Sequence, residues 1–364
     1  MAEIIVKTVS YNESKDKIYQ GDDSLGIYSY TQSEERINTF FSNPNLVDYN
    51  STMVNLSIVD GVIAGRSMSF PTRIKLYEKI YPCVTGSSLE VDTEYRHYDI
   101  GVDLVLLPVR NKDNKQLLYA DFSKEGIGMY KAARFNIFKL PILLQPRKID
   151  FVLEMLGLNG VLLAITSYVG NLFLKPLYYI IDLKTKYLTR GLTIEETSVV
   201  PEWIDDITLQ DGHEFMEVHD HRWMQWCLNN MFHYDDNNKN RFFTVKKNDC
   251  PIGFFMFKER HSSVPSLHVD DLNMATVVEW GSNNLSIFDE VIAYRLSSML
   301  CSKKMSIIRI ATDDIITQKK CKRFFFFKHG EHFIVHKDNT KQFKETKNQS
   351  LWRLRFGYSD SIFN

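Results

Sequence analysis

The sequence predicts an α+β protein of two tandem domains, each a mixed central sheet flanked by helices. The first observation is length, because 364 residues exceed the usual size of one domain. The second is composition: 44% apolar and 24% charged residues are typical of globular proteins and exclude a disordered or collagen-like chain. The third is that one order of elements, hairpin–strand–helix–strand–helix–strand, is expected twice along the chain.

The first copy of this order is expected within residues 1–145. Asp60-Gly61 is a two-residue hairpin signal between the alternating runs Thr52–Val59 and Val62–Phe70. A long strand over Lys79–Val91 then leads through a polar loop into an apolar helix that ends near Pro108. The other expected elements are the strands Glu3–Thr8, Gln116–Phe122 and Phe135–Leu144 and the helices Ser33–Phe41 and Ser123–Arg134.

The second copy is expected within residues 190–364, after a helical connector over residues 146–189. Its expected elements are the helix Trp223–Met231, the hairpin strands Phe242–Lys247 and Ile252–Lys258, the strand Met274–Trp280, the helix Ile287–Leu300, the strand Ser306–Ala311, the helix Ile315–Phe327 and the strands Phe333–His336 and Leu351–Phe356. The two halves share little sequence identity, so the repeat is one of element order.

One segment of the connector has the length of a membrane-spanning helix. Met155–Leu174 carries no charged residue over 20 positions. It also contains Asn159, Ser167, Asn171 and three glycines, and a spanning helix is usually more apolar. These interruptions favour a helix packed between domains over membrane contact.

Charge and cysteine content favour a cytoplasmic protein without nucleic-acid partners. With a formal net charge of −1, the chain as a whole does not attract nucleic acid or an anionic membrane. The basic run Lys319–Arg323 before Phe324–Phe327 is expected to be a solvated helix face that leads into a buried segment. Five widely spaced cysteines indicate free thiols in a reducing compartment, and the first residues do not form a signal peptide.

The segment with the strongest chemical pattern is a strand–loop–helix in the first half. The strand Ser87–Val91 runs into the loop Tyr95–Gly101 and then into the apolar helix. Successive backbone N–H groups at a helix N-terminus attract a pyrophosphate, and a glycine lets the phosphate approach the backbone. The pattern therefore predicts an anion-binding turn.

This segment resembles the acyl-coenzyme A binding motif of the GNAT N-acetyltransferase superfamily, in which Arg/Gln-x-x-Gly-x-Gly/Ala opens the helix. Arg96 and Gly101 match this motif, whereas Asp99 stands where the middle glycine is usual. The resemblance continues downstream at Tyr130 and Phe135, although Ser123 and Arg134 depart from the usual Asn and Gly. It covers about residues 1–145.

Two segments of the second half are distinctive: Arg222–Trp226 before the expected hairpin and Leu351–Asp360 near the end. With these segments the second half resembles a degenerate GNAT domain, as in tandem-domain members of the superfamily. Its strand at Val277–Trp280 leads into Gly281–Ser286, which lacks the Arg/Gln-x-x-Gly-x-Gly pattern and is expected to be a polar loop with an N-cap at Ser286. One cofactor site per chain is therefore expected, in the first domain. The second domain would shape the acceptor site.

The resemblance implies a set of site residues for acetyl-CoA as co-substrate. Tyr130 would protonate the leaving thiolate, and Glu90 would act as the base for an incoming amine. The expected cofactor-binding residues are Leu89, Val91, Arg96, His97, Tyr98, Asp99, Ile100, Gly101 and Ser123. Each has a plainer interpretation: Tyr130 as a packed core residue, Glu90 as part of an exposed strand face, and Arg96 as a solvated loop residue.

Asp99 is the main objection to cofactor binding, because a carboxylate repels a phosphate. Its place before a helix also suits an N-cap. No metal site is expected, since His213, His219 and His221 lie in a polar stretch without a nearby cysteine, which favours a solvated loop.

The function expected from the resemblance is acetyl transfer from acetyl-CoA to an amine, which could belong to a small molecule or a peptide. A non-catalytic scaffold on the same fold is one alternative, and an aminoacyl-transfer enzyme of the peptidoglycan-bridge type is another. The near-neutral charge argues against the latter, which would use a charged transfer RNA. The sequence leaves the acceptor and the oligomeric state open.

Overall fold

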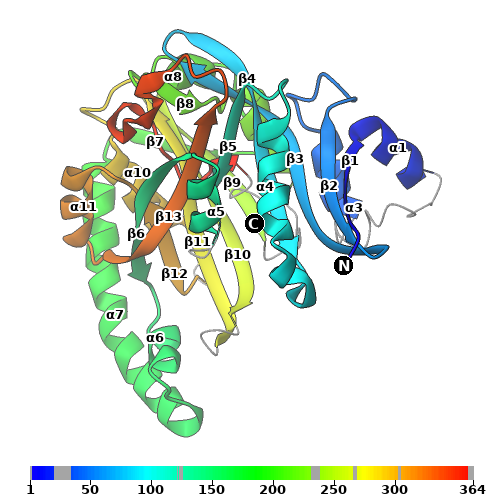
Figure 1. The fold of residues 1–364 in the computed structure, drawn as a ribbon. Coiled ribbons are helices and arrows are strands. Elements are labelled where there is room, and N and C mark those ends of the chain that lie inside the picture. Colours follow the sequence, from blue (N-terminus) through cyan, green and yellow to red (C-terminus); the bar gives the residue numbers. More distant parts are fainter. Residues whose placement is uncertain are drawn as a thin grey trace.

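The computed structural model describes residues 2–19, 34–120, 122, 126–230, 238–264, 269–301 and 305–359. Within these residues the strands form one mixed 13-stranded sheet in the order β1-β2-β3-β4-β5-β13-β6-β12-β11-β10-β9-β7, with β8 paired to β3 (Figure 1). This sheet with its flanking helices is the α+β architecture that the sequence predicts.

The first half supplies one end of the sheet. Its elements are β1 (Ile4–Ser10), α1 (Tyr11–Tyr19), α3 (Glu34–Phe41), β2 (Thr52–Val59), β3 (Val62–Leu76), β4 (Lys79–Val91), the 3-10 helix η1 (Thr93–Tyr98), α4 (Ile100–Arg110), β5 (Gln116–Ala120), α5 (Ile127–Ala132) and β6 (Asn136–Pro146). The predicted hairpin at Asp60-Gly61 joins β2 to β3, with both residues at positive φ. Antiparallel pairing then continues from β3 to β4.

The second half supplies the other end of the sheet. Its elements are α6 (Asp150–Met155), α7 (Gly160–Leu188), β7 (Leu192–Thr197), α8 (Ile204–Leu209), β8 (Phe215–Glu217), α9 (His221–Asn229), β9 (Lys239–Lys247), β10 (Cys250–Val264), β11 (Val269–Ser282), α10 (Glu290–Leu300), β12 (Ile307–Ala311), α11 (Ile315–Lys322), β13 (Phe327–Asp338) and the 3-10 helices η3 (Lys344–Lys347) and η4 (Gln349–Leu351).

The halves exchange strands in the middle of the sheet. β13 lies between β5 and β6 and pairs antiparallel with both. β6 in turn pairs antiparallel with β12. The proposed boundaries at residues 145 and 190 stay a prediction, since strands from both sides alternate here. A shared apolar cluster, with Phe40 and Phe70 from the first half and Trp223 and Phe254 from the second, joins the halves further.

Each half contains one parallel strand pair that separates after a few residues. β4 pairs with β5 at Val84–Leu117 and Thr85–Leu118. β11 pairs with β12 from Met274–Ile307 to Thr276–Arg309. In each pair, a helix follows the first strand along the chain and packs beside that strand: α4 follows β4, and α10 follows β11. We call the openings beyond these pairings the first and the second strand fork.

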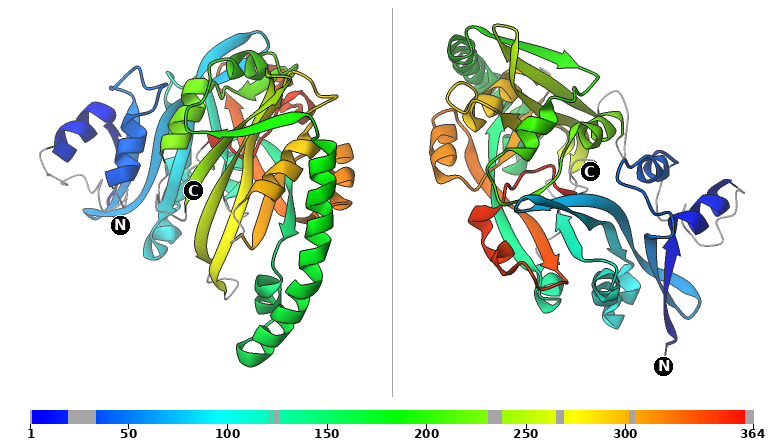
Figure 2. Two further views of the ribbon diagram at one scale, coloured as in Figure 1. Left: turned by 180° about the vertical axis from the view of Figure 1, so that it is seen from behind. Right: turned by 90° about the horizontal axis from the view of Figure 1, so that it is seen from above.

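The connector helix α7 projects beyond the sheet with α6 beside it (Figures 1 and 2). Its last turns pack on the protein body through the buried residues Tyr178, Ile181 and Thr185. Its outer side carries apolar side chains that are 46% to 76% exposed, a set that we call the outer stripe of α7: Val161, Leu162, Ile165, Tyr168, Val169, Leu172, Phe173, Tyr179, Ile180, Leu183 and Tyr187. The expectation of a helix packed between domains is therefore wrong for most of α7.

By length and composition alone, α7 is the one helix in the described part of the chain that could cross a membrane, and 6% of its most apolar window is buried. The expectation fails because it treated each polar residue as a sign of protein contact. The structure shows that the apolar residues, spaced three and four apart, gather on the side of the helix that faces away from the body.

Two other predicted elements differ. Leu351–Phe356 is irregular after η4 and not a strand, because its backbone is held by contacts from separate segments, such as the Arg353 amide donating to the Phe215 carbonyl at 2.9 Å. α11 ends at Lys322, and Phe325 has φ 63°, so the aromatic run that follows is not helical. The expected burial of this run is correct for Phe326, which is 1% exposed, and wrong for Phe325 and Phe327, which are exposed.

Candidate functional site

A large cavity lies in the first strand fork, with a volume of about 920 Å³. Its walls come from β3, β4, α4 as far as Pro108, the end of β5 and α5, with Arg36 from α3 at one side. The cavity exists because β4 and β5 separate after Thr85 and Leu118 while α4 and α5 stay on one face of the sheet.

The base of this fork is closed by an aromatic ring. Tyr119 follows the last paired residue of β5, and a Cβ built on Gly86 would lie 1.8 Å from its ring carbon Cε1. Only glycine at position 86 leaves room for this ring. The Tyr119 side chain lines the cavity, is 7% exposed, and its hydroxyl has no hydrogen-bond partner among the described residues. Burial raises the pKa of this hydroxyl well above its ordinary value.

A β-bulge forms the wall of the cavity on β4. Arg66 pairs with Glu90 and Met68 pairs with Ser87, so Ser67 on β3 faces both Ser88 and Leu89 on β4. Ser88 has φ 53°, which is the left-handed geometry of a bulged residue. A bulge disrupts the ladder and redirects backbone groups. The predicted residues Leu89, Glu90 and Val91 follow this bulge and line the cavity.

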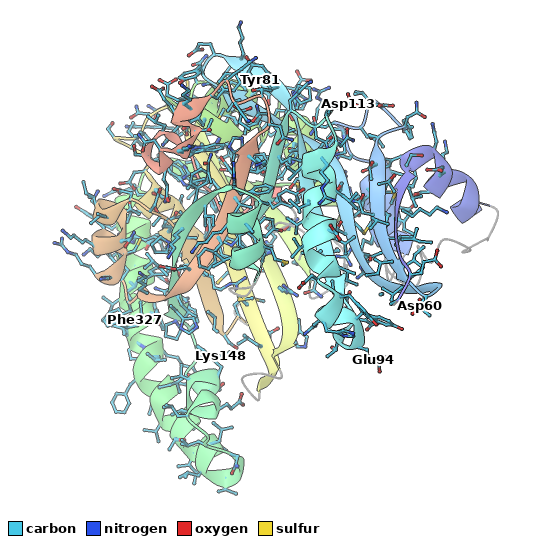
Figure 3. The ribbon with its side chains drawn as sticks, viewed as in Figure 1. Asp60, Tyr81, Glu94, Asp113, Lys148 and Phe327 are labelled. Atoms are coloured by element: carbon cyan, nitrogen blue, oxygen red, sulfur yellow. The ribbon has the colours of Figure 1, made fainter. Side chains whose placement is uncertain are left out.

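The predicted anion-binding turn forms the mouth of the cavity. Asp99 takes left-handed geometry with φ 55° and ψ 17°, between η1 and α4. Asp99 occupies the N-cap position of α4, as expected, but its side chain makes no capping hydrogen bond. The resemblance places glycine at this position, and the backbone takes a conformation that glycine favours. Figure 3 labels Glu94 in η1, at the tip formed with α4.

Arg96 and Gly101 also line the cavity, together with Asp99. Nε of Arg96 donates to the Val91 carbonyl at 3.2 Å, which holds the turn against the end of β4. A Cβ on Gly101 would lie 3.5 Å from both Met129 and Val91, an ordinary contact. The fold itself therefore tolerates a side chain at position 101.

Three other predicted cofactor residues do not line the cavity. Ile100 is 1% exposed and packs in a cluster with Val59 and Ala64. The rings of His97 and Tyr98 lie 3.9 Å apart at the outer end of the turn. Ser123 lies outside the described residues.

Tyr130 lines the cavity from α5 and is 4% exposed. Its ring packs against Tyr119, Phe122 and Phe135 with centroid distances of 5.6, 4.5 and 5.3 Å. Tyr130 is therefore both a packed aromatic residue and part of the cavity wall. An aromatic cluster of this kind fixes the ring and its hydroxyl relative to β4.

Glu90 forms an ion pair with Arg66. Its Oε2 lies 2.7 Å from the Arg66 guanidinium, whose side chain is 4% exposed, whereas the Glu90 side chain is 62% exposed. The arginine reaches Glu90 across the antiparallel β3–β4 pair. This contact orients the carboxylate at the rim of the cavity.

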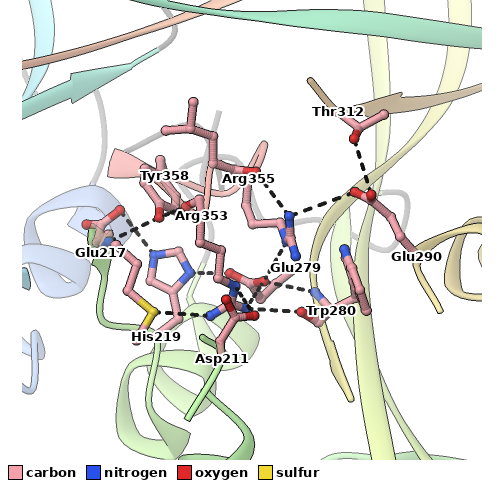
Figure 4. A network of polar contacts seen from close by, with 12 residues as sticks. Asp211, Glu217, His219, Glu279, Trp280, Glu290, Thr312, Arg353, Arg355 and Tyr358 are labelled. Atoms are coloured by element: carbon pink, nitrogen blue, oxygen red, sulfur yellow. Dashed lines mark hydrogen bonds and ion pairs between the residues drawn. The ribbon is translucent and has the colours of Figure 1, made fainter. Parts of the chain in front are cut away.

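The second strand fork is occupied by the chain itself. The segment after η4 lies along β11, and the Gly357 amide donates to the Val278 carbonyl at 3.0 Å. Arg355 lies between Glu279 of β11 and Glu290 of α10, at 3.5 and 3.8 Å (Figure 4). The side chain of Arg353 also donates to Glu279, at 2.5 Å.

His219 completes this buried network. Its ring nitrogens lie 2.5 Å from Glu279 and 3.1 Å from Glu217, all three side chains are fully buried, and its ring stacks on Trp223 at 3.6 Å. Burial by itself lowers the pKa of His219, but the contacts with Glu217 and Glu279 raise it above its ordinary value. Burial would raise the pKa of Glu279, yet Arg353 and His219 lower it to about 2.

Local sequence patterns do not predict this network. The solvated-loop interpretation of His213, His219 and His221 is wrong for His219, which is 0% exposed. Its partners come from β8, β11 and the C-terminal segment, so no local spacing could reveal them. The N-cap of α10 is Asp289, whose side chain accepts from the Ile292 amide at 2.8 Å, and not Ser286. No group of metal-binding side chains occurs among the residues that the structure describes.

No family model matches the sequence, and no curated protein matches it either. The fold, however, resembles solved structures over almost the whole chain. A conserved protein of unknown function from Enterococcus faecalis V583, described as a probable N-acyltransferase, is 14% identical with a TM-score of 0.56 and covers 94% of this chain and 74% of its own. A GCN5-related N-acetyltransferase from Anabaena variabilis ATCC 29413 is 8% identical with a TM-score of 0.55, covering 93% of this chain and 73% of its own.

The third similar structure is N-myristoyltransferase from Saccharomyces cerevisiae with bound myristoyl-CoA. It is 11% identical with a TM-score of 0.55 and covers 92% of this chain and 82% of its own. Identities this low establish a shared fold and not a shared activity. The resemblance drawn from the sequence motifs is confirmed at the level of the fold, which this chain shares with solved structures described as N-acetyltransferases and N-myristoyltransferases.

Proposed function

We propose that the protein is an acyl-CoA-dependent N-acyltransferase whose co-substrate binds in the first strand fork. The observation that carries this proposal is the joint position of the β4 bulge, the Arg96–Gly101 turn and Tyr130 around one cavity. A left-handed residue directly before a helix N-terminus presents successive N–H groups to an anion. The pyrophosphate would lie at this turn and the pantetheine arm along β4.

The residues around the cavity suit direct acyl transfer. The amine nitrogen attacks the thioester carbonyl, the new C–N bond forms, and the C–S bond breaks. Backbone N–H groups at Leu89–Val91, next to the bulge, would stabilise the charge that develops on the carbonyl oxygen. Tyr130 would donate its proton to the thiolate, and Glu90 at the rim would accept the proton that the amine loses.

The base of the fork supports a short acyl group. The Tyr119 ring fills the space between β4 and β5 at the point where the strands separate. A long acyl chain directed between these strands would meet this ring. We therefore propose acetyl-CoA as the co-substrate and a small-molecule or peptide amine as the acceptor.

The experiment that tests this proposal is calorimetric titration of the full chain with coenzyme A, followed by hydrogen exchange. We expect a stoichiometry near one and protection of the backbone amides of residues 94–101. Titration without heat, or saturating ligand that leaves these amides unprotected, would exclude the proposal and leave the non-catalytic scaffold. A stoichiometry of two would overturn the assignment of the site to the first fork alone.

A further inference from the structure

The outer stripe of α7 forms one continuous apolar face along the whole helix. At about 100° per residue, its members fall within an arc of roughly 140° over 29 residues. Their exposed fractions include 76% for Val161, 72% for Phe173 and 74% for Tyr187. A monomeric soluble protein rarely leaves so long an apolar face in water.

Two polar side chains within the charge-free stretch, those of Asn171 and Thr166, are hydrogen-bonded within the α6–α7 hairpin. The Asn171 side chain accepts from the Ile149 amide at 2.9 Å and donates to Asp150 at 2.7 Å. The Thr166 hydroxyl donates to the Leu162 carbonyl of its own helix at 2.6 Å. Ser167 is 8% exposed, so it lies away from the outer stripe, and its hydroxyl has no hydrogen-bond partner among the described residues. The contacts of Asn171 and Thr166 pair these two side chains internally, as a lipid environment requires of polar groups.

The charged residues along α7 lie beside the stripe and are mainly basic. Lys175 and Lys186 fall on one flank of the stripe and Lys184 on the other, by their positions on the helix. The acidic residue of α7 is Asp182, and its carboxylate lies 3.3 Å from the Arg147 guanidinium on the side of the helix that faces the body. Long basic side chains beside an apolar face can extend to lipid headgroups.

Helix α11 adds further basic side chains next to α7. The basic run Lys319–Arg323 closes α11, which lies on the same side of the molecule as α7 (Figure 2). The two elements adjoin, since Nζ of Lys184 lies 5.4 Å from the centroid of the Phe324 ring. The exposed Phe327 lies on this side as well (Figure 3).

We propose that the outer stripe of α7 and the basic end of α11 bind the surface of an anionic lipid bilayer. The apolar stripe would enter the boundary between headgroups and acyl chains, and the lysines would contact anionic headgroups. The hairpin starts at β6 and returns to β7 in the same sheet, so both its ends stay on one side of the bilayer. The contact is therefore interfacial and not a span.

Charge favours lipid over a second copy of the chain as the occupant. Two copies that paired through this face would bring the Lys319–Arg323 runs and the α7 lysines toward each other, and like charges at a contact oppose association. Anionic headgroups complement the same charges. Exposed aromatic residues such as Tyr168 and Tyr187 suit the boundary between water and lipid.

The test is co-sedimentation of the full chain with vesicles of phosphatidylcholine containing about a third phosphatidylserine. Wild-type protein should sediment with these vesicles, and the double variant Ile165→Glu/Phe173→Glu should bind at least about tenfold more weakly, because it places charge in the apolar face. The matched control is Val47→Glu/Leu285→Glu, which changes two exposed apolar residues elsewhere on the surface and should bind like wild type.

The basic end of α11 is tested separately. Lys319→Ala/Lys322→Ala/Arg323→Ala should weaken binding to the anionic vesicles by up to about fivefold for each charge removed. The loss should be smaller at high salt and with pure phosphatidylcholine. Coenzyme A titration and circular dichroism of each variant check that the fold and the first fork are unchanged, so this proposal can fail while the proposed function stands.

Two outcomes would overturn the proposal. One is wild-type protein that stays in the supernatant with anionic vesicles. The other is a dimer in sedimentation velocity without vesicles that Ile165→Glu/Phe173→Glu converts to monomer, since the face would then be an interface between two copies of this chain.

Discussion

Strands β4 and β5 in the first half and strands β11 and β12 in the second half separate in the same way after a short parallel pairing. What lies beyond the pairing differs. The first fork holds a cavity of about 920 Å³, whereas the second holds Arg355 and the backbone of Gly357 from the C-terminal segment. The same strand geometry therefore leaves an open cavity in one half and buries a charged network in the other.

The difference follows from the residues that each fork presents. In the second fork, Glu279 and Glu290 are buried acidic groups that would repel a phosphate, and arginines of the chain neutralise them. In the first fork, the backbone of β4 bulges toward a cavity and the turn before α4 is left-handed. A buried ion network gives the second half its rigid link to the C-terminal segment, while the first half keeps an open site.

The largest contrast that we expect concerns the tyrosines of the two forks. Tyr130→Phe should lower turnover by about 10- to 10⁴-fold with little change in coenzyme A affinity, because it removes the proton for the leaving thiolate. Steady-state kinetics with acetyl-CoA and a responsive amine would measure this.

The matched control is Tyr294→Phe, which removes a buried hydroxyl hydrogen-bonded to Glu290 in the second fork. Its turnover per folded molecule should equal that of wild type. A Tyr130→Phe variant with normal turnover would show that Tyr130 only packs, and the two forks would then not differ in chemistry.

The next contrast concerns stability. Arg353→Met should lower the free energy of unfolding by about 3–5 kcal/mol, since it removes one of the two cationic groups that lie 2.5 Å from the buried Glu279 carboxylate. Arg96→Met in the exposed turn of the first fork should change it by about 0.5 kcal/mol or less. Urea denaturation measures both, and equal losses would contradict the assignment of structural and binding roles to the two forks.

The first fork could be anticipated from sequence because its determinants are local. The hairpin at Asp60-Gly61, the run from Lys79 to Val91 and the turn from Arg96 to Gly101 each follow from neighbouring residues. The β4 bulge could not be anticipated, because it depends on the register with β3. Tyr119 was missed for a similar reason: its role arises from its contact with Gly86 across the fork.

The second fork depends on segments far apart in the chain. His219 reads as a polar-loop residue until Glu279, 60 positions later, is placed beside it. Leu351–Phe356 has the alternation of a strand, yet Arg353 and Arg355 turn toward buried carboxylates. The direction in which α7 faces was equally inaccessible, since periodicity identifies an apolar side but not what that side meets.

Two buried histidines should give opposite dependences of stability on pH. The pKa of His219 in the second fork is raised, so its contribution is complete below about pH 6.5 and is lost as the pH rises through the folded-state pKa. Burial lowers the pKa of His336 on β13 to about 3, so its neutral form stabilises the fold above about pH 6.5, and this contribution is lost as the pH falls toward 3.

Urea midpoints of His219→Gln and His336→Gln between pH 4 and 9 separate these contributions. Relative to wild type, the His219 variant should lose the decline above pH 6.5, and the His336 variant should lose the decline below it. Each slope is at most about 1.4 kcal/mol per pH unit for one proton. Parallel curves for the two variants would mean that His219 is not held charged.

The smallest contrast concerns the aspartates that precede the helices beside the two forks. Asp99 before α4 is left-handed and caps nothing, whereas Asp289 before α10 caps the Ile292 amide. Asp99→Gly should tighten coenzyme A binding by about fivefold at low salt, from the roughly 1 kcal/mol between unit charges about 4 Å apart in water, and glycine also suits the backbone there. The gain should shrink as salt rises.

Asp289→Gly is the matched substitution in the second fork. It should leave coenzyme A affinity unchanged and cost a few tenths of a kcal/mol of stability, because glycine replaces a capping side chain. Titrations of both variants at two salt concentrations measure the difference. Weaker coenzyme A binding by Asp99→Gly would mean that the Asp99 carboxylate contributes to the site, for example by holding Arg96 or the acceptor amine. The proposed repulsion between Asp99 and the phosphate would then be wrong.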